Sequence, residues 1–234
     1  MTTSDTSLGQ VAQGHISVRH HPGDGDVPYD LVQFNYDEHP FTDVVAGLFG
    51  EAELERLGAA LAGSDHRRRQ TDQASIWHRQ FYDSFDVLRA TYRDLIEHEV
   101  REYMDEPFYF QAVPTLRVHL PGEVGGSEFH TDRQFGHPVG ELNFWLPLTR
   151  AWGTNSVWIE RDVGDDVFVA AEASPGEIIV FNAVELRHGS TVNETRRTRV
   201  SFDFRCIAVS DFESSGMSQD GFVPGAYYSA DLIA

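Results

Sequence analysis

The chain of 234 residues suits one domain with a substantial core, and its hydrophobic fraction of 41% is that of a globular protein. A formal net charge of −19 disfavours nucleic acid and anionic membranes as partners. All 18 basic residues are Arg, which excludes Schiff-base chemistry on Lys. The single cysteine, Cys206, excludes an internal disulfide and a cysteine-based zinc site. Without a membrane-length apolar run we expect a cytoplasmic protein that acts on a small molecule, and its oligomeric state stays open.

Two regions precede the strand-rich part of the chain. Residues 1–30 are rich in small and polar side chains and predict a mobile N-terminal arm, which leaves residues 31–234 as a single domain. Apolar stripes at helical spacing predict one helix over residues 51–61, with Gly63 as its stop, and a second helix over residues 86–104. Helices of this kind normally buttress a sheet, so we assign them no chemistry.

From about residue 108 the hydrophobic pattern changes to a period of two. Turn signals separate eight short strand-like segments, at residues 115–120, 128–133, 140–148, 155–160, 167–171, 176–182, 186–191 and 197–207. Short strands at even spacing favour a jelly roll, that is, a cupin-like double-stranded β-helix barrel. Because helices come first, we predict an α+β fold with N-terminal helices buttressing a barrel whose core spans about residues 108–208.

A metal-ligand pattern lies on this predicted barrel. Residues two apart in a strand point to one face, so His130 and Asp132 can converge on one ion while Thr131 points away. His188, at the start of the seventh segment, can supply a third ligand. Two His and one carboxylate on one face form the facial triad of non-haem Fe(II) oxygenases. One His-x-Asp is expected by chance in a chain with 11 His, so the argument depends on the order of the motifs along the strands.

The eighth segment carries an Arg-x-Ser motif. Arg199 and Ser201 share a strand face, while Val200 and Phe202 occupy the other face. A guanidinium forks onto a carboxylate with two parallel hydrogen bonds, and a hydroxyl adds a third. This pair therefore suits the distal carboxylate of 2-oxoglutarate. The competing interpretation is a solvated Arg in the run that starts at Arg196, and the alternating apolar positions argue against it.

The sequence around these motifs resembles the Fe(II)- and 2-oxoglutarate-dependent dioxygenase superfamily, and within it the StrG-like and phytanoyl-CoA-hydroxylase-like group. The resemblance covers about residues 108–208 and is carried by Glu128–Pro138, Gly140–Thr149, Asn155–Glu160 and His188–Thr191. It implies Fe(II) held by His130, Asp132 and His188. It also implies 2-oxoglutarate as a co-substrate that chelates the iron and pairs with Arg199 and Ser201, and O2 as the oxidant. The carboxylate of Asp132 favours hydroxylation over halogenation.

Further polar and aromatic residues are candidates for contacts to the co-substrate or the substrate. Asn143 is predicted on an inward face, where it either contacts 2-oxoglutarate or is a satisfied core amide. Asp203 and Arg205 continue the Arg199 face and can pair with each other, and Arg117 has a buried ion pair as its alternative. The candidate substrate contacts are Arg117, Gln134, Trp145, Trp158 and Arg205.

We therefore expect an Fe(II)- and 2-oxoglutarate-dependent oxygenase that hydroxylates a polar small molecule, such as an amino acid, cyclitol or sugar derivative, in a biosynthetic pathway. The same site can instead perform desaturation, cyclisation or epimerisation, depending on how the substrate lies. Two alternatives come from other classes: a zinc-dependent cupin-type hydrolase or isomerase, and a non-catalytic binding protein. The Arg-x-Ser motif argues against both, because neither needs a co-substrate socket.

Overall fold

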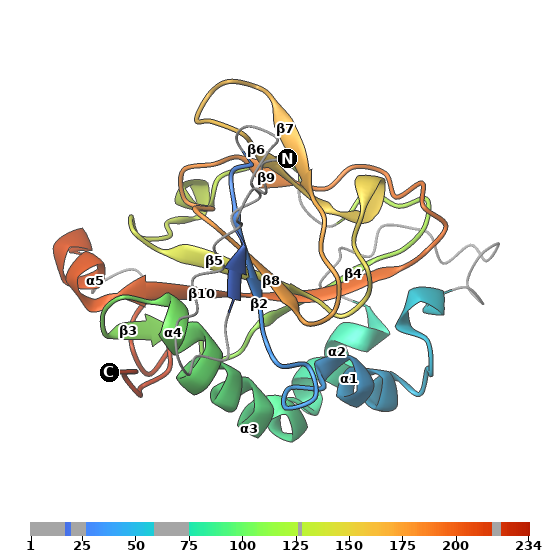
Figure 1. The fold of residues 1–234 in the computed structure, drawn as a ribbon, viewed down its shortest axis with the longest axis horizontal. Coiled ribbons are helices and arrows are strands. Elements are labelled where there is room, and N and C mark those ends of the chain that lie inside the picture. The colour runs from blue at the N-terminus through green and yellow to red at the C-terminus, as the bar shows by residue number, and fades with distance from the viewer. Residues whose placement is uncertain (1–16, 20–26, 59–74, 126–127, 217–220) are drawn as a thin grey trace, which may run out of the picture.

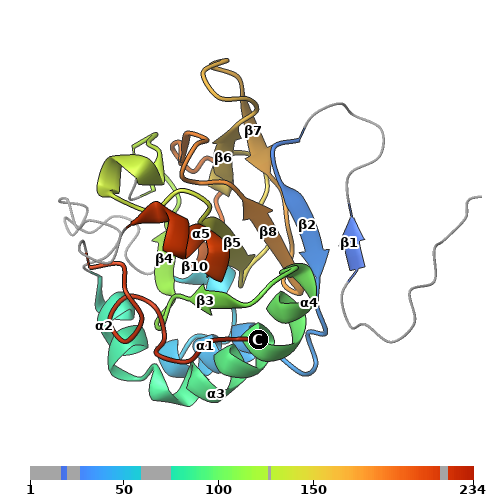
Figure 2. The same ribbon diagram turned by 90° about the vertical axis from the view of Figure 1, so that its left-hand side faces the viewer.

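In the computed structural model, the described residues are 17–19, 27–58, 75–125, 128–216 and 221–234. Two antiparallel sheets and a group of helices form three layers (Figure 1). In the turned view, β6 and β7 lie above β5, β8 and β10, and helices α1 to α3 lie below (Figure 2). None of the described helices is both long and apolar enough to cross a lipid bilayer.

The larger sheet has seven strands in the order β1-β2-β8-β5-β10-β3, and β4 also pairs with β10. Its strands are β1 (Ser17–Arg19), β2 (Asp30–Gln33), β3 (Phe108–Phe110), β4 (Thr115–His119), β5 (Leu142–Pro147), β8 (Glu177–Phe181) and β10 (Arg199–Ala208). The smaller sheet has the order β7-β6-β9, with β6 (Val157–Glu160), β7 (Phe168–Ala171) and β9 (His188–Gly189). Within the described part of the chain, strand pairing does not close the two sheets into one barrel.

Seven of the eight predicted segments contain strands, and the prediction for residues 128–133 is wrong. In that stretch His130 forms a single antiparallel bridge with His188, and Asp132 begins the 3-10 turn η5 (Asp132–Phe135). Gly136 ends this turn with a left-handed φ of 83°, a conformation that glycine adopts without a steric penalty. Strands β1, β2 and β3 lie outside the predicted set. Most of the predicted N-terminal arm, residues 1–16 and 20–26, lies outside the described residues, while β1 pairs with β2.

The helices are α1 (Phe41–Phe49), α2 (Ile76–Asp83), α3 (Asp86–Leu95), the π-helical turn η4 (Ile96–Val100), α4 (Arg101–Tyr103) and α5 (Val209–Ser215). Short 3-10 turns are η1 (Leu54–Arg56) and η6 (Gly153–Asn155). The predicted helix over residues 86–104 is confirmed as the continuous run α3-η4-α4.

The predicted helix over residues 51–61 is wrong in its described part. Leu54 and Leu57 are buried as expected, but they extend from the single turn η1. Leu57 leaves the helical region at ψ 135°, and Gly58 follows with a φ of 76°, so the helix cannot continue. The remainder of that prediction, including Gly63, lies among residues that the structure does not describe.

The outer face of the larger sheet packs against the helices. Phe202 of β10 meets Phe41 of α1 edge-on at 5.2 Å between ring centroids, and Phe204 meets Tyr92 of α3 at 5.4 Å. A second apolar cluster unites both sheets, with Trp145 and Ile179 from the larger sheet and Ile159 from the smaller. The space between the sheets is therefore an interior in which polar groups must find partners.

Candidate metal centre and co-substrate pocket

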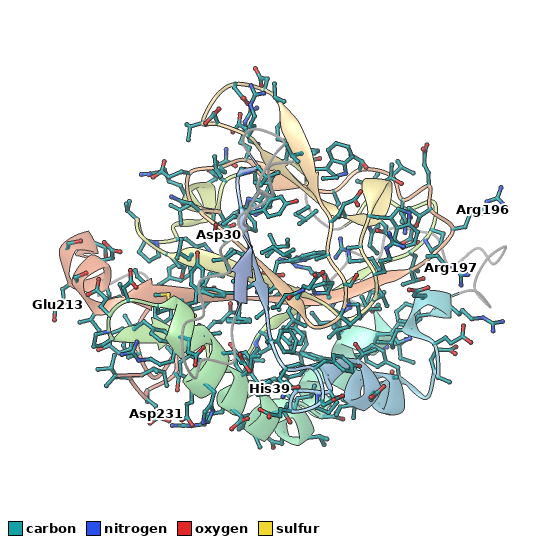
Figure 3. All side chains as sticks on the ribbon, in the orientation of Figure 1. Asp30, His39, Arg196, Arg197, Glu213 and Asp231 are labelled. Carbon is teal, nitrogen blue, oxygen red and sulfur yellow. The ribbon has the colours of Figure 1, made fainter. Side chains whose placement is uncertain are left out.

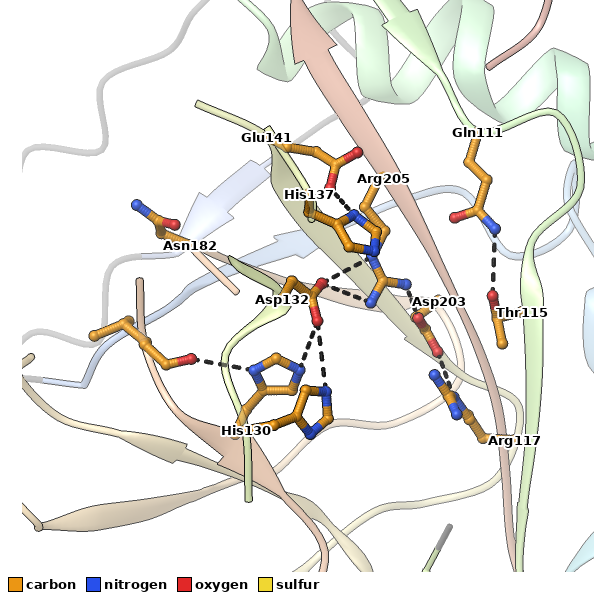
Figure 4. Close-up of polar contacts among 12 residues, drawn as sticks. Gln111, Thr115, Arg117, His130, Asp132, His137, Glu141, Asn182, Asp203 and Arg205 are labelled. Atoms are coloured by element: carbon orange, nitrogen blue, oxygen red, sulfur yellow. Dashed lines mark hydrogen bonds and ion pairs between the residues drawn. The ribbon is translucent and has the colours of Figure 1, made fainter. Parts of the chain in front are cut away.

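Three ligand-type side chains meet between the two sheets. The Nε2 atoms of His130 and His188 each lie 3.5 Å from Oδ1 of Asp132 (Figure 4). Reciprocal backbone hydrogen bonds between the two His residues, of 3.0 and 2.8 Å, hold their segments side by side. Thr131 is extended, with φ −104° and ψ 148°, so Asp132 keeps the orientation expected in a strand although it opens a 3-10 turn. The structure thus brings together the three ligands predicted from the sequence.

Backbone carbonyls fix which nitrogen of each imidazole faces this point. Nδ1 of His130 lies 2.6 Å from the carbonyl oxygen of Glu128, and Nδ1 of His188 lies 3.1 Å from that of Leu186. A carbonyl oxygen only accepts, so each neutral ring carries its proton on Nδ1 and presents the lone pair of Nε2. This outer hydrogen bond is the arrangement that orients metal-binding His residues in proteins.

The two oxygens of the Asp132 carboxylate have different partners. Oδ1 faces the two His residues, and Oδ2 accepts hydrogen bonds from Nη2 and Nε of Arg205 at 2.9 and 3.2 Å. Burial alone would raise the pKa of Asp132, but the Arg205 guanidinium and the two imidazoles hold that pKa well below its usual range. Asp132 is therefore ionised, as a metal ligand must be.

The ion pair at Asp132 continues into a chain of alternating charges. Arg205 also pairs with Asp203, and Asp203 accepts a 2.9 Å hydrogen bond from Nε of Arg117 (Figure 4). The predicted pairing of Asp203 with Arg205 is confirmed, and so is the ion pair considered for Arg117. Contact between Arg205 and Asp132 was not predicted, because the two residues are far apart in sequence and no local pattern connects them.

Arg199 lines the same pocket as His130 and His188 and is 4% exposed. Its Nη1 donates to Oγ of Ser201 at 3.0 Å, its Nη2 donates to Oγ of Ser190 at 3.3 Å, and its Nε donates to the carbonyl of Asn155 at 3.0 Å. The guanidinium also lies over the ring of Trp145, 5.6 Å from the centroid, which is a cation–π contact. The predicted pair of Arg199 and Ser201 thus meets within a socket of hydroxyl and carbonyl oxygens.

The pocket lining contains most of the predicted candidates. Asn143 and Trp145 of β5 lie in register with Arg205 and Asp203 of β10, so they share the pocket face. Oδ1 of Asn143 is buried and has no hydrogen-bond partner among the described residues. The lining residues are Arg117, His130, Asn143, Trp145, Val157, His188, Ser190, Arg199, Asp203 and Arg205.

Two predicted substrate contacts lie outside this lining, and two lining residues, Val157 and Ser190, were not predicted. Gln134 is exposed on η5, and Trp158 alternates with the lining residue Val157 on β6. Ser190, which holds Arg199, did not appear among the candidates. It follows His188 by two positions, so the strand period that related His130 to Asp132 also places Ser190 on the ligand face.

Comparison with solved structures supports the fold. EctD from S. alaskensis with 2-oxoglutarate and 5-hydroxyectoine is 20% identical, with a TM-score of 0.51 over 85% of this chain and 73% of that chain. The same protein with bound Fe is also 20% identical and gives a TM-score of 0.50 over 86% of each chain. This chain therefore shares its fold with EctD.

Comparison with curated sequences identifies the family of the chain. The chain is 40% identical to the streptomycin biosynthesis protein StrG of Streptomyces griseus over 186 residues, which are 79% of this chain and 87% of StrG. The chain therefore belongs to the StrG family, and no protein-family model matches it.

Proposed function

We propose that residues 31–234 form a single oxygenase domain that uses Fe(II), 2-oxoglutarate and O2 to hydroxylate a polar small molecule in a biosynthetic pathway. The observation that carries this proposal is a single pocket lined by His130 and His188 of the His130–Asp132–His188 cluster and also by Arg199. A metal-dependent hydrolase needs the first feature only, whereas an enzyme with a carboxylate-bearing co-substrate needs both. We also propose that the two facing sheets constitute the double-stranded β-helix expected from the sequence.

The donor set fits Fe(II). Two imidazole nitrogens and one ionised carboxylate oxygen on one side of an ion leave its other positions open for small ligands. Both imidazoles are oriented by backbone carbonyls, and Arg205 holds the carboxylate through the oxygen that does not face the His residues. His130, Asp132 and His188 would therefore hold the iron without rearranging, which lowers the cost of binding it.

The part of the pocket around Arg199 fits 2-oxoglutarate. Arg199 offers a planar cation for a distal carboxylate, and the hydroxyls of Ser201 and Ser190 fix the guanidinium and can donate to the same anion. Asn143 can donate from Nδ2 to the co-substrate, while its unpartnered Oδ1 can accept from a hydroxyl or amine of the substrate. Trp145 under the guanidinium keeps water away from this part.

With iron, 2-oxoglutarate and O2 bound, the chemistry supplied is oxidative decarboxylation to succinate and CO2, coupled to insertion of the other oxygen atom into a C–H bond of the substrate. The protein's share is positioning and exclusion of water, because the buried pocket face of β10 fixes both parts of the site. StrG is a streptomycin biosynthesis protein, and its similarity supports a cyclitol or sugar derivative among the polar substrates proposed.

The test is 2-oxoglutarate turnover by the iron-loaded protein, measured as succinate, across a panel of amino acids, cyclitols, aminocyclitols and sugars. We expect one substrate class to raise succinate formation and to gain the mass of one oxygen atom. Arg199→Ala should abolish the effect at low 2-oxoglutarate, whereas Arg196→Ala should not, because Arg196 projects from the edge of the molecule (Figure 3). Loss of two hydrogens would indicate desaturation or cyclisation, and unchanged mass would indicate epimerisation. Turnover by the zinc-loaded protein without 2-oxoglutarate would contradict the proposal.

A further inference from the structure

A second group of metal-ligand side chains lies away from this pocket, among the helices. His39 precedes α1, and Glu99 belongs to the π-helical turn η4. Each side chain is 1% exposed. Figure 3 shows His39 in the helical layer, below the sheets. Turns with π-helical hydrogen bonding often mark functional sites, so a buried carboxylate in such a turn requires an explanation.

Neither side chain is satisfied by hydrogen bonds. Both ring nitrogens of His39 and both carboxylate oxygens of Glu99 are buried without a hydrogen-bond partner among the residues that the structure describes. Nε2 of His39 lies 3.5 Å from Oε1 of Glu99, which is too long for a good N–H···O bond. Burying four such polar atoms together is costly unless something else binds them.

The separation of these atoms suits a shared zinc ion. With zinc–ligand bonds of about 2.0–2.1 Å, neighbouring ligands of a tetrahedral site lie about 3.3–3.4 Å apart. Glu38 offers a carboxylate oxygen within 4.8 Å of the ligand atoms of His39 and Glu99. Since Glu38 is exposed, it gives the ion a path from solvent and leaves room for water as a fourth ligand.

The far side of the imidazole also fits a metal site. Oδ2 of Asp94 lies 3.7 Å from Nδ1 of His39, on the opposite edge of the ring from Glu99. A carboxylate behind a metal-bound His is the usual way in which proteins fix its orientation. Phe34 and Phe41 flank the ring, with centroids 5.9 and 6.3 Å away, and give the site an apolar surround.

We propose that His39, Glu99 and Glu38 bind a structural Zn²⁺ ion, with Asp94 orienting the imidazole. This ion joins the segment before α1 to η4 and so ties together two parts of the helical layer that packs against β10. The site is separate from the His130–Asp132–His188 cluster and does not depend on the proposed oxygenase activity. Imidazole nitrogens and carboxylate oxygens are both among the ligands that zinc binds in proteins.

The experiment counts zinc in a protein whose His130–Asp132–His188 cluster has been disrupted. The background variant is His130→Ala/His188→Ala, stripped with a chelator, reloaded with Zn²⁺, dialysed and analysed for metal. We expect one zinc per chain in this background and loss of that zinc when Glu99→Gln is added. Asp94→Asn should retain the zinc but weaken its binding about 10–100-fold, as expected for a carboxylate behind a metal-bound His.

The matched control is Glu97→Gln, which removes an exposed carboxylate from the same turn and should leave the zinc content unchanged. The melting temperature is the second measurement, since an ion that binds only the folded state raises it. Zn²⁺ should raise the melting temperature of the background variant, and Mg²⁺ should not. A background variant that holds no zinc and gains no thermal stability from it would overturn the proposal. Zinc retained in full after Glu99→Gln would overturn it as well.

Discussion

The two faces of β10 are equally buried, and yet one is built from charges and the other from hydrocarbon. The face toward the pocket carries Arg199, Ser201, Asp203 and Arg205, and the face toward the helices carries Val200, Phe202, Phe204 and Cys206. Every residue of the strand is buried, so burial itself does not distinguish a site from a core. The two faces differ in the interactions that stabilise their side chains.

On the apolar face, the side chains are stabilised by packing against the helices. On the polar face, each charge depends on the next, from Arg117 through Asp203 and Arg205 to Asp132. Such a chain contributes little net stability, because desolvation of the ions offsets their attraction. We infer that its role is to hold Asp132, the proposed metal ligand at which it ends. Substitutions on the two faces should therefore affect different properties.

The largest expected effect on stability is that of Phe202→Ala. Phe202 is 1% exposed and packs against Phe41, so its truncation leaves a cavity in the helix-facing core. We expect the free energy of unfolding to fall by about 3–5 kcal/mol, measured by urea denaturation. The folded fraction should still bind one Fe(II) at the triad. Two outcomes would contradict this account. A loss below about 1 kcal/mol would mean that Phe202 is not part of the stabilising core, and loss of the triad iron from the folded protein would mean that the apolar face also determines iron binding.

The next effect in size is that of Arg205→Met on iron affinity. Met keeps the volume of the side chain but leaves Asp132 without the donor to its Oδ2. Because such outer partners of a metal ligand are typically worth 10–100-fold in affinity, we expect Fe(II) binding to weaken by about that factor. Anaerobic titration calorimetry measures it. The control is Arg117→Met. Arg117 lies at the other end of the row of ion pairs and does not contact Asp132 in it, so its substitution should have a clearly smaller effect on iron affinity. Equal effects of the two variants would contradict the direct role of Arg205.

A smaller effect is expected from Ser201→Ala, which removes a hydroxyl that accepts from Arg199 on the polar face. A typical hydrogen bond contributes about 0.5–1.5 kcal/mol, so the dissociation constant for 2-oxoglutarate should rise roughly two- to tenfold while stability changes little. Fluorescence or calorimetric titration of the iron-loaded protein would show this. Ser190→Ala should give a change of similar size, because Ser190 accepts from the same guanidinium. Unchanged affinity for 2-oxoglutarate in both variants would contradict the proposal that Arg199 binds the co-substrate.

The smallest expected effect is that of Glu160→Gln, in the smaller sheet, on stability at acid pH. The hydrogen bond from Arg187 lowers the pKa of Glu160 from 4.5 to about 2, and Arg187 directly precedes His188, a proposed metal ligand. A depressed pKa means that the ionised form stabilises the fold at pH values above about 4.5 and that this contribution disappears as the pH falls toward 2. The stability difference between wild type and Glu160→Gln should therefore be constant above pH 4.5 and shrink below it. A constant difference down to pH 2 would exclude ionised Glu160 as its source.

The sequence was most informative where a residue's role depends on its strand period. The faces of β10 and the convergence of His130 with His188 followed from alternation and from the order of the segments. Even the wrong strand at residues 128–133 kept Asp132 in place, because one extended residue, Thr131, maintains the alternation. The family resemblance then favoured iron over zinc, a choice that the spacing of the ligand residues alone leaves open.

Features that depend on distant contacts were not predictable. The pairing of Arg205 with Asp132 joins β10 to a turn 73 residues earlier, and no local pattern reports it. Helix α1 was also not predicted, although Phe41 and Val45, which are buried on one face of it, are spaced four residues apart as in a helix. The helix expected at residues 51–61 is absent from the described part of that segment. The apolar pattern was misleading there, because Leu54 and Leu57 reach the core from a single 3-10 turn.

The most direct test of the central claim is an anaerobic titration of Fe(II) and 2-oxoglutarate, followed by the visible charge-transfer absorption of the chelated iron. We predict an absorption band in the wild type and in the control Arg196→Ala. The band should be absent in His188→Ala, and in Arg199→Ala it should require much more 2-oxoglutarate. Absence of the band in the iron-loaded wild type would contradict the assignment of this pocket to Fe(II) and 2-oxoglutarate.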